Sequence, residues 1–221
     1  MEPLGLNIQV QSNLYIKNPD SSALGREILA KSIELINQIG FESFTFKKLS
    51  QVIQSTESSI YRYFKSKHSL LIYLTSWYWM WVDYKIVMAT TNIDDANTRL
   101  NKAITVLTQP LKKDNFTSSI NIEWLDRIII NESIKAYHTV DVDSENKKGF
   151  FQAYKNVVNR VAQLVQDVNS SFPFPHMLVS TVIEGAHQQR FFSEHLPNLT
   201  DADKTDAITQ FYHQMVLKML A

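Results

Sequence analysis

The sequence predicts an all-α protein of about nine helices, with an N-terminal three-helix head followed by a C-terminal helical bundle. Only five glycines and six prolines occur in 221 residues, which leaves little room for a turn-rich all-β fold. Apolar residues recur at spacings of three and four through most of the chain, the pattern of amphipathic helices. A hydrophobic content of 44% and a charged content of 20% are typical of a globular protein with a buried core.

Composition also argues against several classes of protein. The chain has no run of 18 or more apolar residues and no basic segment followed by an apolar one, so we expect neither a membrane span nor a secretory signal. It has no cysteine, and therefore neither a disulfide nor a thiolate metal site. These features favour a cytoplasmic protein without a membrane partner.

The first segment, residues 1–20, lacks helical periodicity and is expected to form a loose tail or a strap over the fold. A helix should then run from about Ser22 to Ile39, with Ser21 or Ser22 as its N-cap and Gly40 at its end.

Residues 45–70 read as two short helices joined by a tight turn. Thr45 is placed to cap the first helix, whose inner side carries Leu49, Val52 and Ile53. The polar residues from Gln54 to Thr56 interrupt this pattern, and Thr56 can cap the second helix. Hydrogen-bond donors alternate with the apolar residues of that second helix, and they are Ser58, Ser59, Arg62, Tyr63, Lys65 and Lys67.

Positive charge gathers in the same stretch. The whole chain has no net charge, with 22 basic and 22 acidic residues, whereas residues 41–70 contain five lysines or arginines and two glutamates, a balance of +3. A helix pair that presents a basic, donor-rich second helix suits the major groove of double-stranded DNA.

The stretch Ile60–Leu70, Ile-Tyr-Arg-Tyr-Phe-Lys-Ser-Lys-His-Ser-Leu, resembles the LYxYFxxKxxL motif of the TetR family of bacterial regulators. The upstream apolar residues and Gly40 follow the first-helix pattern of the same family, so the resemblance covers about residues 24–71. It implies a DNA-binding domain at 21–67 and a ligand-binding and dimerisation domain at 68–221. It further implies a homodimer formed through the last two helices and a small-molecule effector, and a two-fold dimer would read a palindromic operator.

We assign DNA-binding roles to nine residues as hypotheses. Three are expected to position the head on phosphates: Thr45, Lys47 and Thr56. Three are candidates for base edges: Ser58, Ser59 and Arg62. Three match motif positions of the family, two tyrosines and its phosphate-binding lysine: Tyr61, Tyr63 and Lys67. Gln54 stands where such turns usually place glycine, and a left-handed conformation there costs about 1–2 kcal/mol.

Six further helices are expected after the helix pair. They lie at about Ser66–Met88, Asp94 or Asp95 to Thr108, Ser119–His138, Ser144–Val168, Pro175–His195 and Asp201–Leu220. Gly185 and Ala186 form a small-residue patch that lets another helix approach closely. Bulky residues of this part are candidates for the wall of an effector pocket, with plain core packing as the alternative: Trp77, Trp81, Trp124, Ile128 and Tyr154. Few charges lie on their faces, so the expected effector is apolar or aromatic.

Enzyme motifs are missing from the sequence. Glu184 and His187 have the Glu-x-x-His spacing of di-iron bundles, but the second copy that such sites need is absent. There is no Gly-x-Ser-x-Gly, P-loop or dinucleotide-binding turn. We therefore expect no catalytic residues, no metal and no cofactor.

The sequence as a whole favours a sequence-specific DNA-binding transcriptional regulator, a repressor released by its effector. The alternative is a helical ligand-binding or protein-binding module that has lost operator binding.

Overall fold

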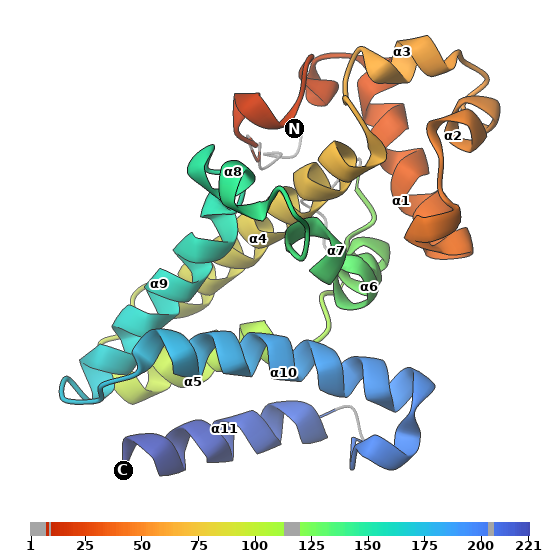
Figure 1. The fold of residues 1–221 in the computed structure, drawn as a ribbon. Coiled ribbons are helices and arrows are strands. Elements are labelled where there is room, and N and C mark those ends of the chain that lie inside the picture. Colours follow the sequence, from red (N-terminus) through yellow and green to blue (C-terminus); the bar gives the residue numbers. More distant parts are fainter. Residues whose placement is uncertain (1–7, 9, 113–119, 203–205) are drawn as a thin grey trace, which may run out of the picture. The chain divides into compact units, whose positions relative to one another are not determined.

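The computed structural model describes residues 8, 10–112, 120–202 and 206–221. In these ranges the chain forms eleven α-helices and three short 3₁₀ helices and contains no strand, which confirms the all-α prediction (Figure 1). The α-helices are α1 Ala23–Ser43, α2 Phe46–Val52, α3 Glu57–Tyr61, α4 Lys67–Thr90, α5 Ala96–Thr108, α6 Ile122–Glu132, α7 Ile134–Tyr137, α8 Val142–Lys147, α9 Gln152–Val168, α10 Pro175–His195 and α11 Ala207–Leu220. The 3₁₀ helices are Ser12–Leu14, Pro19–Ser21 and Pro197–Leu199.

Two of the expected helices are divided in the structure. The helix expected to end at His138 consists of α6 and α7, because the chain tightens at Ser133, whose carbonyl accepts from the N–H of Ala136 only three residues on. The expected start of that helix, Ser119, lies outside the described residues. The helix expected from Ser144 consists of α8 and α9, which are separated at Gly149, where φ is +81°.

The chain divides into two compact units. The first unit contains the residues up to Tyr78 together with Leu111–Gln152, and the second contains Trp79–Pro110 together with Ala153–Ala221. Helix α4 therefore contributes its first half to one unit and its second half to the other. No helix among the described residues has the length and apolar character needed to span a membrane.

The core of the first unit forms where α1 packs on α2 and on α6, and where α2 packs on α3. Apolar side chains from α1 to α4 are completely buried there: Ile28, Leu29, Ile33, Leu49, Ile60, Phe64, Leu70 and Leu71. Burying each such side chain contributes about 1.5–3 kcal/mol, so the three-helix head rests on a substantial core of its own.

Residues 10–22, which we call the N-terminal strap, pack against the head. The Ile16 N–H donates to the Tyr63 carbonyl at 2.8 Å, and the Tyr15 ring meets the Tyr73 ring edge-on, with centroids 6.1 Å apart. Gly25 allows the strap to approach α1, since a Cβ at that position would collide with the backbone of Pro19. The strap is thus an integral layer of the first unit.

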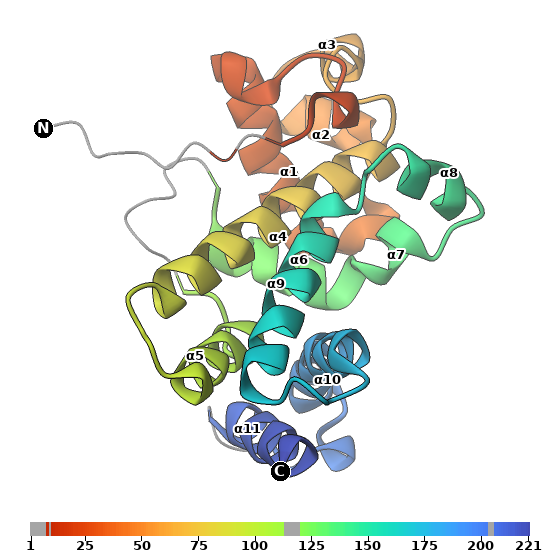
Figure 2. The ribbon, with the colours of Figure 1, turned by 90° about the vertical axis from the view of Figure 1, so that its left-hand side faces the viewer.

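The second unit is built on α10 and α11, which run antiparallel and side by side and both pack against α5 (Figures 1 and 2). The close approach expected at Gly185 is present, because the Tyr212 hydroxyl of α11 fills the space that a Cβ would occupy. The bidentate pair of Arg160 on α9 with Asp83 on α4, at 2.6 and 3.0 Å, joins two further helices of this unit.

Candidate nucleic-acid interface

Helices α2 and α3 form a helix-turn-helix whose two N-caps are the residues expected from the sequence. Thr45 Oγ1 accepts from the Lys48 N–H at 3.2 Å, and Thr56 Oγ1 accepts from the Ser59 N–H at 3.2 Å. Leu49 and Ile53 are buried as expected, but the expectation that Val52 faces inward is wrong, because this residue beside the turn is 46% exposed.

A Schellman motif makes the turn between the two helices. The N–H of Ser55 donates to the Ser50 carbonyl at 3.0 Å and that of Gln54 to the Gln51 carbonyl at 3.4 Å. Gln54 has a φ of +49°, so it adopts the left-handed conformation anticipated for this position. A residue with a Cβ there stores strain that glycine would not.

The exposed surface of the pair contains most of the predicted DNA-binding residues. Thr45, Lys47, Thr56, Ser58, Tyr61 and Arg62 are exposed, and Ser59 is half-buried. The hydroxyls of Ser58 and Ser59 each lie 2.9 Å from Thr56 Oγ1, so they form one cluster at the start of α3. The Tyr61 ring is 48% exposed, and its other side packs on Phe46 with centroids 5.0 Å apart. We call this set of residues the head surface.

Tyr63, which is also a predicted DNA-binding residue, does not lie on the head surface. Its side chain is only 3% exposed, and its hydroxyl lies 2.8 Å from Ser22 Oγ, at the N-cap of α1. The Lys17 ammonium of the strap stands over its ring, 5.2 Å from the centroid. The Ser22 hydrogen bond, helped by Lys17 and Arg62, lowers the pKa of the Tyr63 phenol. The structure therefore places Tyr63 between α1 and the strap, away from the head surface.

Lys67 is half-buried at the start of α4, where it caps the end of α1. Its ammonium donates to the carbonyls of Phe41 and Glu42, at 3.0 and 3.1 Å, and stands 4.8 Å from the Phe41 ring centroid. An ammonium has three N–H donors, so one remains for a further acceptor such as a phosphate. Lys67 thus fixes the ends of two helices next to the head surface.

A second group of charged residues, which no local sequence pattern indicates, holds the same end of α1. The Phe41 N–H donates to Glu132 Oε1 of α6 at 3.1 Å. Lys135 of α7 pairs with Glu132 at 2.7 Å and with Glu42 at 2.9 Å. Glu132 chiefly, with Glu42, raises the pKa of Lys135. These partners lie about ninety residues apart, so no local pattern could have revealed them.

Two exposed lysines of the head, Lys48 and Lys65, contribute to its positive charge and are not among the nine predicted DNA-binding residues. Lys48 donates to the Ser43 carbonyl at 2.8 Å and so helps to close the end of α1. Lys65 is exposed after α3. The positive balance of residues 41–70 was the available indication for both.

The five predicted pocket residues fall into different units. Trp77, Trp124 and Ile128 belong to the first unit, whereas Trp81 and Tyr154 belong to the second. Trp77, Trp81 and Ile128 are 7%, 1% and 2% exposed, so they pack as core residues, while Trp124 and Tyr154 are half-buried.

Tyr154 takes part in a group of aromatic and polar side chains inside the second unit, which we call the aromatic–polar cluster. Its ring stacks on Trp79 with centroids 4.3 Å apart, and its hydroxyl donates to Glu184 Oε1 at 2.7 Å. The ring of His187 stacks on Trp79 at 5.9 Å. Burial, assisted by the nearby Arg190, lowers the pKa of His187 to about 3.

The sequence offered a partial indication of this cluster. The Glu-x-x-His spacing places Glu184 and His187 one helical turn apart, and the structure pairs Glu184 with a tyrosine. In the part of the chain that the structure describes, no group of three or more histidine, aspartate or glutamate side chains could hold a metal ion.

Residues 28–74, which include the whole helix-turn-helix, match the model of the family described as bacterial regulatory proteins, tetR family. No curated protein sequence matches the chain.

Several solved structures share the fold at low identity. A regulatory protein of the tetR family from Rhodococcus RHA1 is 14% identical with a TM-score of 0.60, over 93% of this chain and 98% of that one. AibR in complex with isovaleryl coenzyme A and operator DNA is 13% identical with a TM-score of 0.58, over 88% and 98%. The superantigen PfiT is 12% identical with a TM-score of 0.59, over 91% and 97%. At such identities the likeness shows the fold and leaves function to the site.

The matched segment contains both helices, the turn and the motif at Ile60–Leu70, and the rest of the chain has the helical fold that accompanies this head in solved members. Residues 28–74 are therefore similar to the DNA-binding domain of the tetR family of bacterial regulatory proteins, which supports a DNA-binding transcriptional regulator.

Proposed function

We propose that the protein is a repressor that binds a palindromic operator as a homodimer and releases it when a small apolar or aromatic molecule binds. In this proposal residues 21–67 bind DNA and residues 68–221 bind the effector and form the dimer. The observation that carries it is the head surface, a basic face rich in exposed donors and held by two capped helices and a Schellman turn.

On DNA, we assign the head surface two kinds of contact. Arg62, exposed at the end of α3, is proposed to read a guanine through its two parallel N–H donors, with Ser58 and Ser59 at neighbouring base edges. Thr45, Lys47, Thr56 and the remaining donor of Lys67 are proposed to bind phosphates. Tyr61 lies on the same surface and is proposed to contact the DNA directly. Buried Tyr63 is proposed to act by holding α3, the reading helix, to α1.

The dimer is proposed to form through α10 and α11, on which large apolar side chains face solvent. Met177 is 67% exposed, Phe211 58% and Leu217 51%. Exposed apolar groups concentrated on two adjacent helices mark an interaction surface, and a two-fold dimer would place the two heads on half-sites about 34–36 Å apart or a multiple of this. Phe211→Glu should shift the protein from dimer to monomer in light scattering, whereas exposed Lys147→Glu on α8 should leave it dimeric.

The effector is proposed to be apolar or aromatic because bulky rings dominate the candidate residues, with Tyr154 stacked on Trp79 in the aromatic–polar cluster. The AibR structure contains isovaleryl coenzyme A together with operator DNA, so a protein of this fold can hold an acylated ligand. Titrating isovaleryl coenzyme A and a panel of free aromatic acids into the protein–DNA complex, with release of labelled DNA as the readout, tests this part.

The central experiment measures binding of the protein to labelled DNA from upstream of its own gene, at several salt concentrations. Arg62→Ala should reduce discrimination between operator and unrelated DNA by about 1–3 kcal/mol. Lys47→Ala should weaken binding to all DNA similarly and lower the salt slope by about 1. Lys147→Ala, which removes an exposed lysine of α8, is the control.

Salt-sensitive, sequence-preferring binding that survives Arg62→Ala would contradict the base-reading role alone. The absence of any such binding would favour a helical ligand-binding or protein-binding module that has lost its operator. Such a role is compatible with the fold, since the superantigen PfiT shares it.

A further inference from the structure

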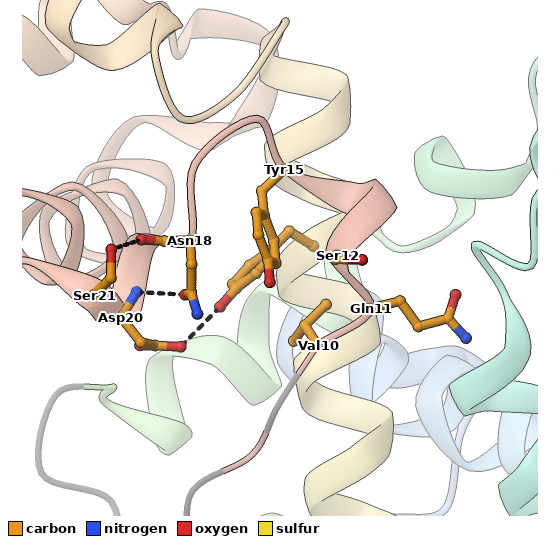
Figure 3. Close-up of a pocket in the computed structure, with 8 residues that line it drawn as sticks. Val10, Gln11, Ser12, Tyr15, Asn18, Asp20 and Ser21 are labelled. Carbon is orange, nitrogen blue, oxygen red and sulfur yellow. Dashed lines mark hydrogen bonds between the residues drawn. The ribbon is translucent and has the colours of Figure 1, made fainter.

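A cavity of about 580 Å³ lies between the N-terminal strap and α4 (Figure 3). Of the eight described residues that line it, seven belong to the strap, from Val10 to Ser21, and the eighth is Tyr73 of α4. The strap thus curves around the cavity, and a buried aromatic ring of α4 closes its inner side. A volume of this size is typical of small-molecule sites.

The described lining of the cavity carries a negative charge. Among the described residues that line it, Asp20 alone has a formal charge, and none is a lysine, an arginine or a histidine. Arg26, the nearest arginine along the chain, donates to the backbone carbonyl of Asp20 at 2.7 Å, while Lys17 stands over the Tyr63 ring. Within the described ranges, no ion pair joins a basic side chain to the Asp20 carboxylate. The cavity therefore contains a half-buried negative charge that a cation would stabilise.

Aromatic rings stand next to that carboxylate. The Tyr73 hydroxyl donates to Asp20 Oδ2 at 3.2 Å, as the dashed line from Asp20 in Figure 3 shows. Burial, and then the charge of Asp20, raise the pKa of the Tyr73 phenol, so it remains a neutral donor and leaves the second carboxylate oxygen for another partner. Tyr15 meets Tyr73 edge-on and supplies a second, half-buried ring. A carboxylate flanked by aromatic rings is the chemistry that recognises an organic cation.

We propose that this cavity binds a small protonated organic amine, with Asp20 as its counter-ion and the rings of Tyr15 and Tyr73 as its apolar wall. Asn18, which also lines the cavity, has its side-chain oxygen next to Asp20, and this oxygen can accept a further N–H group of an ammonium. This site lies entirely within the first unit and does not include the aromatic–polar cluster.

The strap connects this site to the head. Between Tyr15 and Asp20 it donates the Ile16 N–H to the Tyr63 carbonyl, and Ser22, two residues after Asp20, bonds to the Tyr63 hydroxyl. A ligand that holds the strap in this conformation therefore also stabilises the C-terminal end of the reading helix. The binding itself does not depend on whether the head binds DNA.

The first experiment uses calorimetry on the full chain at pH 7 with three probes of matched shape. These are 2-phenylethylammonium, neutral 2-phenylethanol and anionic 3-phenylpropanoate. The ammonium should bind at least about tenfold more tightly than either of the others. Equal binding of the alcohol, or no binding of the ammonium at millimolar concentration, would overturn the proposal.

Three variants locate the binding. Asp20→Asn keeps the size and the hydrogen bond from Tyr73 but removes the charge, and it should weaken ammonium binding by about tenfold or more. Tyr15→Leu should weaken it by a smaller factor because one ring is lost. Asp143→Asn, at an exposed aspartate of α8, should leave it unchanged.

Amide hydrogen exchange of the wild-type protein provides a readout that does not depend on any variant folding. The ammonium should slow exchange in residues 10–22, above all at the Ile16 N–H. Slowed exchange elsewhere with none in the strap, or unchanged affinity in a folded Asp20→Asn protein, would show that the amine binds another site and that the proposal is wrong.

Discussion

The head surface exposes its polar and aromatic side chains to solvent, whereas the aromatic–polar cluster packs similar side chains around a buried ring. In the head, hydroxyls, lysines and an arginine face solvent, and their positions are fixed by caps and a turn only a few residues away in sequence. In the second unit, a tyrosine, a histidine and a glutamate from two helices meet around Trp79, which is 2% exposed. Substitutions in the head should therefore alter binding while leaving stability nearly intact, whereas substitutions in the cluster should alter stability first.

The sharpest test of this contrast removes one ring from each region. Trp79→Ala deletes a buried ring that stacks on two others and should lower the free energy of unfolding by about 3–5 kcal/mol. Tyr61→Ala removes a half-exposed ring and should cost within about 1 kcal/mol while weakening DNA binding. Urea denaturation and a DNA titration on both variants measure the two effects. Equal losses of stability would contradict the contrast.

Two glycines, one in each unit, allow a comparison of how well each unit tolerates an added methyl group at a close contact. In the first unit an alanine at position 25 would meet the backbone of Pro19, whereas in the second an alanine at position 185 would meet the end of the Tyr212 side chain. Backbone yields less readily than a side-chain tip, so Gly25→Ala should destabilise by up to about 3 kcal/mol and Gly185→Ala by less. Thermal melts of the two variants decide the order, and the reverse order would show that the strap moves freely.

Acid should weaken the second unit through His187. In the unfolded chain this histidine gains its proton near pH 6.5, whereas in the folded protein it stays neutral down to about pH 3. Between these values the unfolded state binds more protons, so stability falls as pH falls, by about 1.4 kcal/mol per pH unit and hence about 2 kcal/mol by pH 5. Urea titrations of the wild type and of His187→Gln measure this slope.

The His187→Gln protein should lose that part of the pH dependence. His176→Gln, which replaces an exposed histidine of the same helix, serves as the control and should keep it. A wild-type slope that persists without His187 would assign the acid sensitivity to other groups.

The smallest expected effect concerns the turn of the head. Gln54→Gly relieves a left-handed residue, and after the entropy cost of glycine it should stabilise the protein by about 1 kcal/mol or less. Gln51→Gly, inside α2, should instead cost about 1 kcal/mol. If both glycines destabilise equally, the strain at Gln54 is offset by contacts of its side chain.

Local sequence patterns predicted the head well, because its determinants lie within a few residues of each other. The caps at Ser22, Thr45 and Thr56 each accept the N–H three residues on, as expected from their positions. The motif at Ile60–Leu70 marked the family, and the left-handed residue at Gln54 followed from the turn it occupies.

Contacts between distant segments were not predictable in this way. Lys67 meets carbonyls about 25 residues upstream, and Trp79 meets His187 more than a hundred residues downstream. The division of α6 from α7 depended on a single tightened hydrogen bond, which the uniform apolar pattern concealed. Spacing reveals which residues share a helix face, but it does not reveal what that face contacts.

The tryptophans allow the helix-turn-helix head and the helices that follow it to be observed separately by fluorescence. Three of the four lie on α4, at positions 77, 79 and 81, the fourth is Trp124 on α6, and residues 21–67 contain none. Light that excites only indole therefore reports on α4 and α6, whereas the head contributes only tyrosine emission. A ligand that perturbs the stacked Trp79 changes the emission directly, while DNA bound at the head changes it only if α4 or α6 moves. One fluorescence titration can thus measure whether an event at the head reaches the helix that both units share.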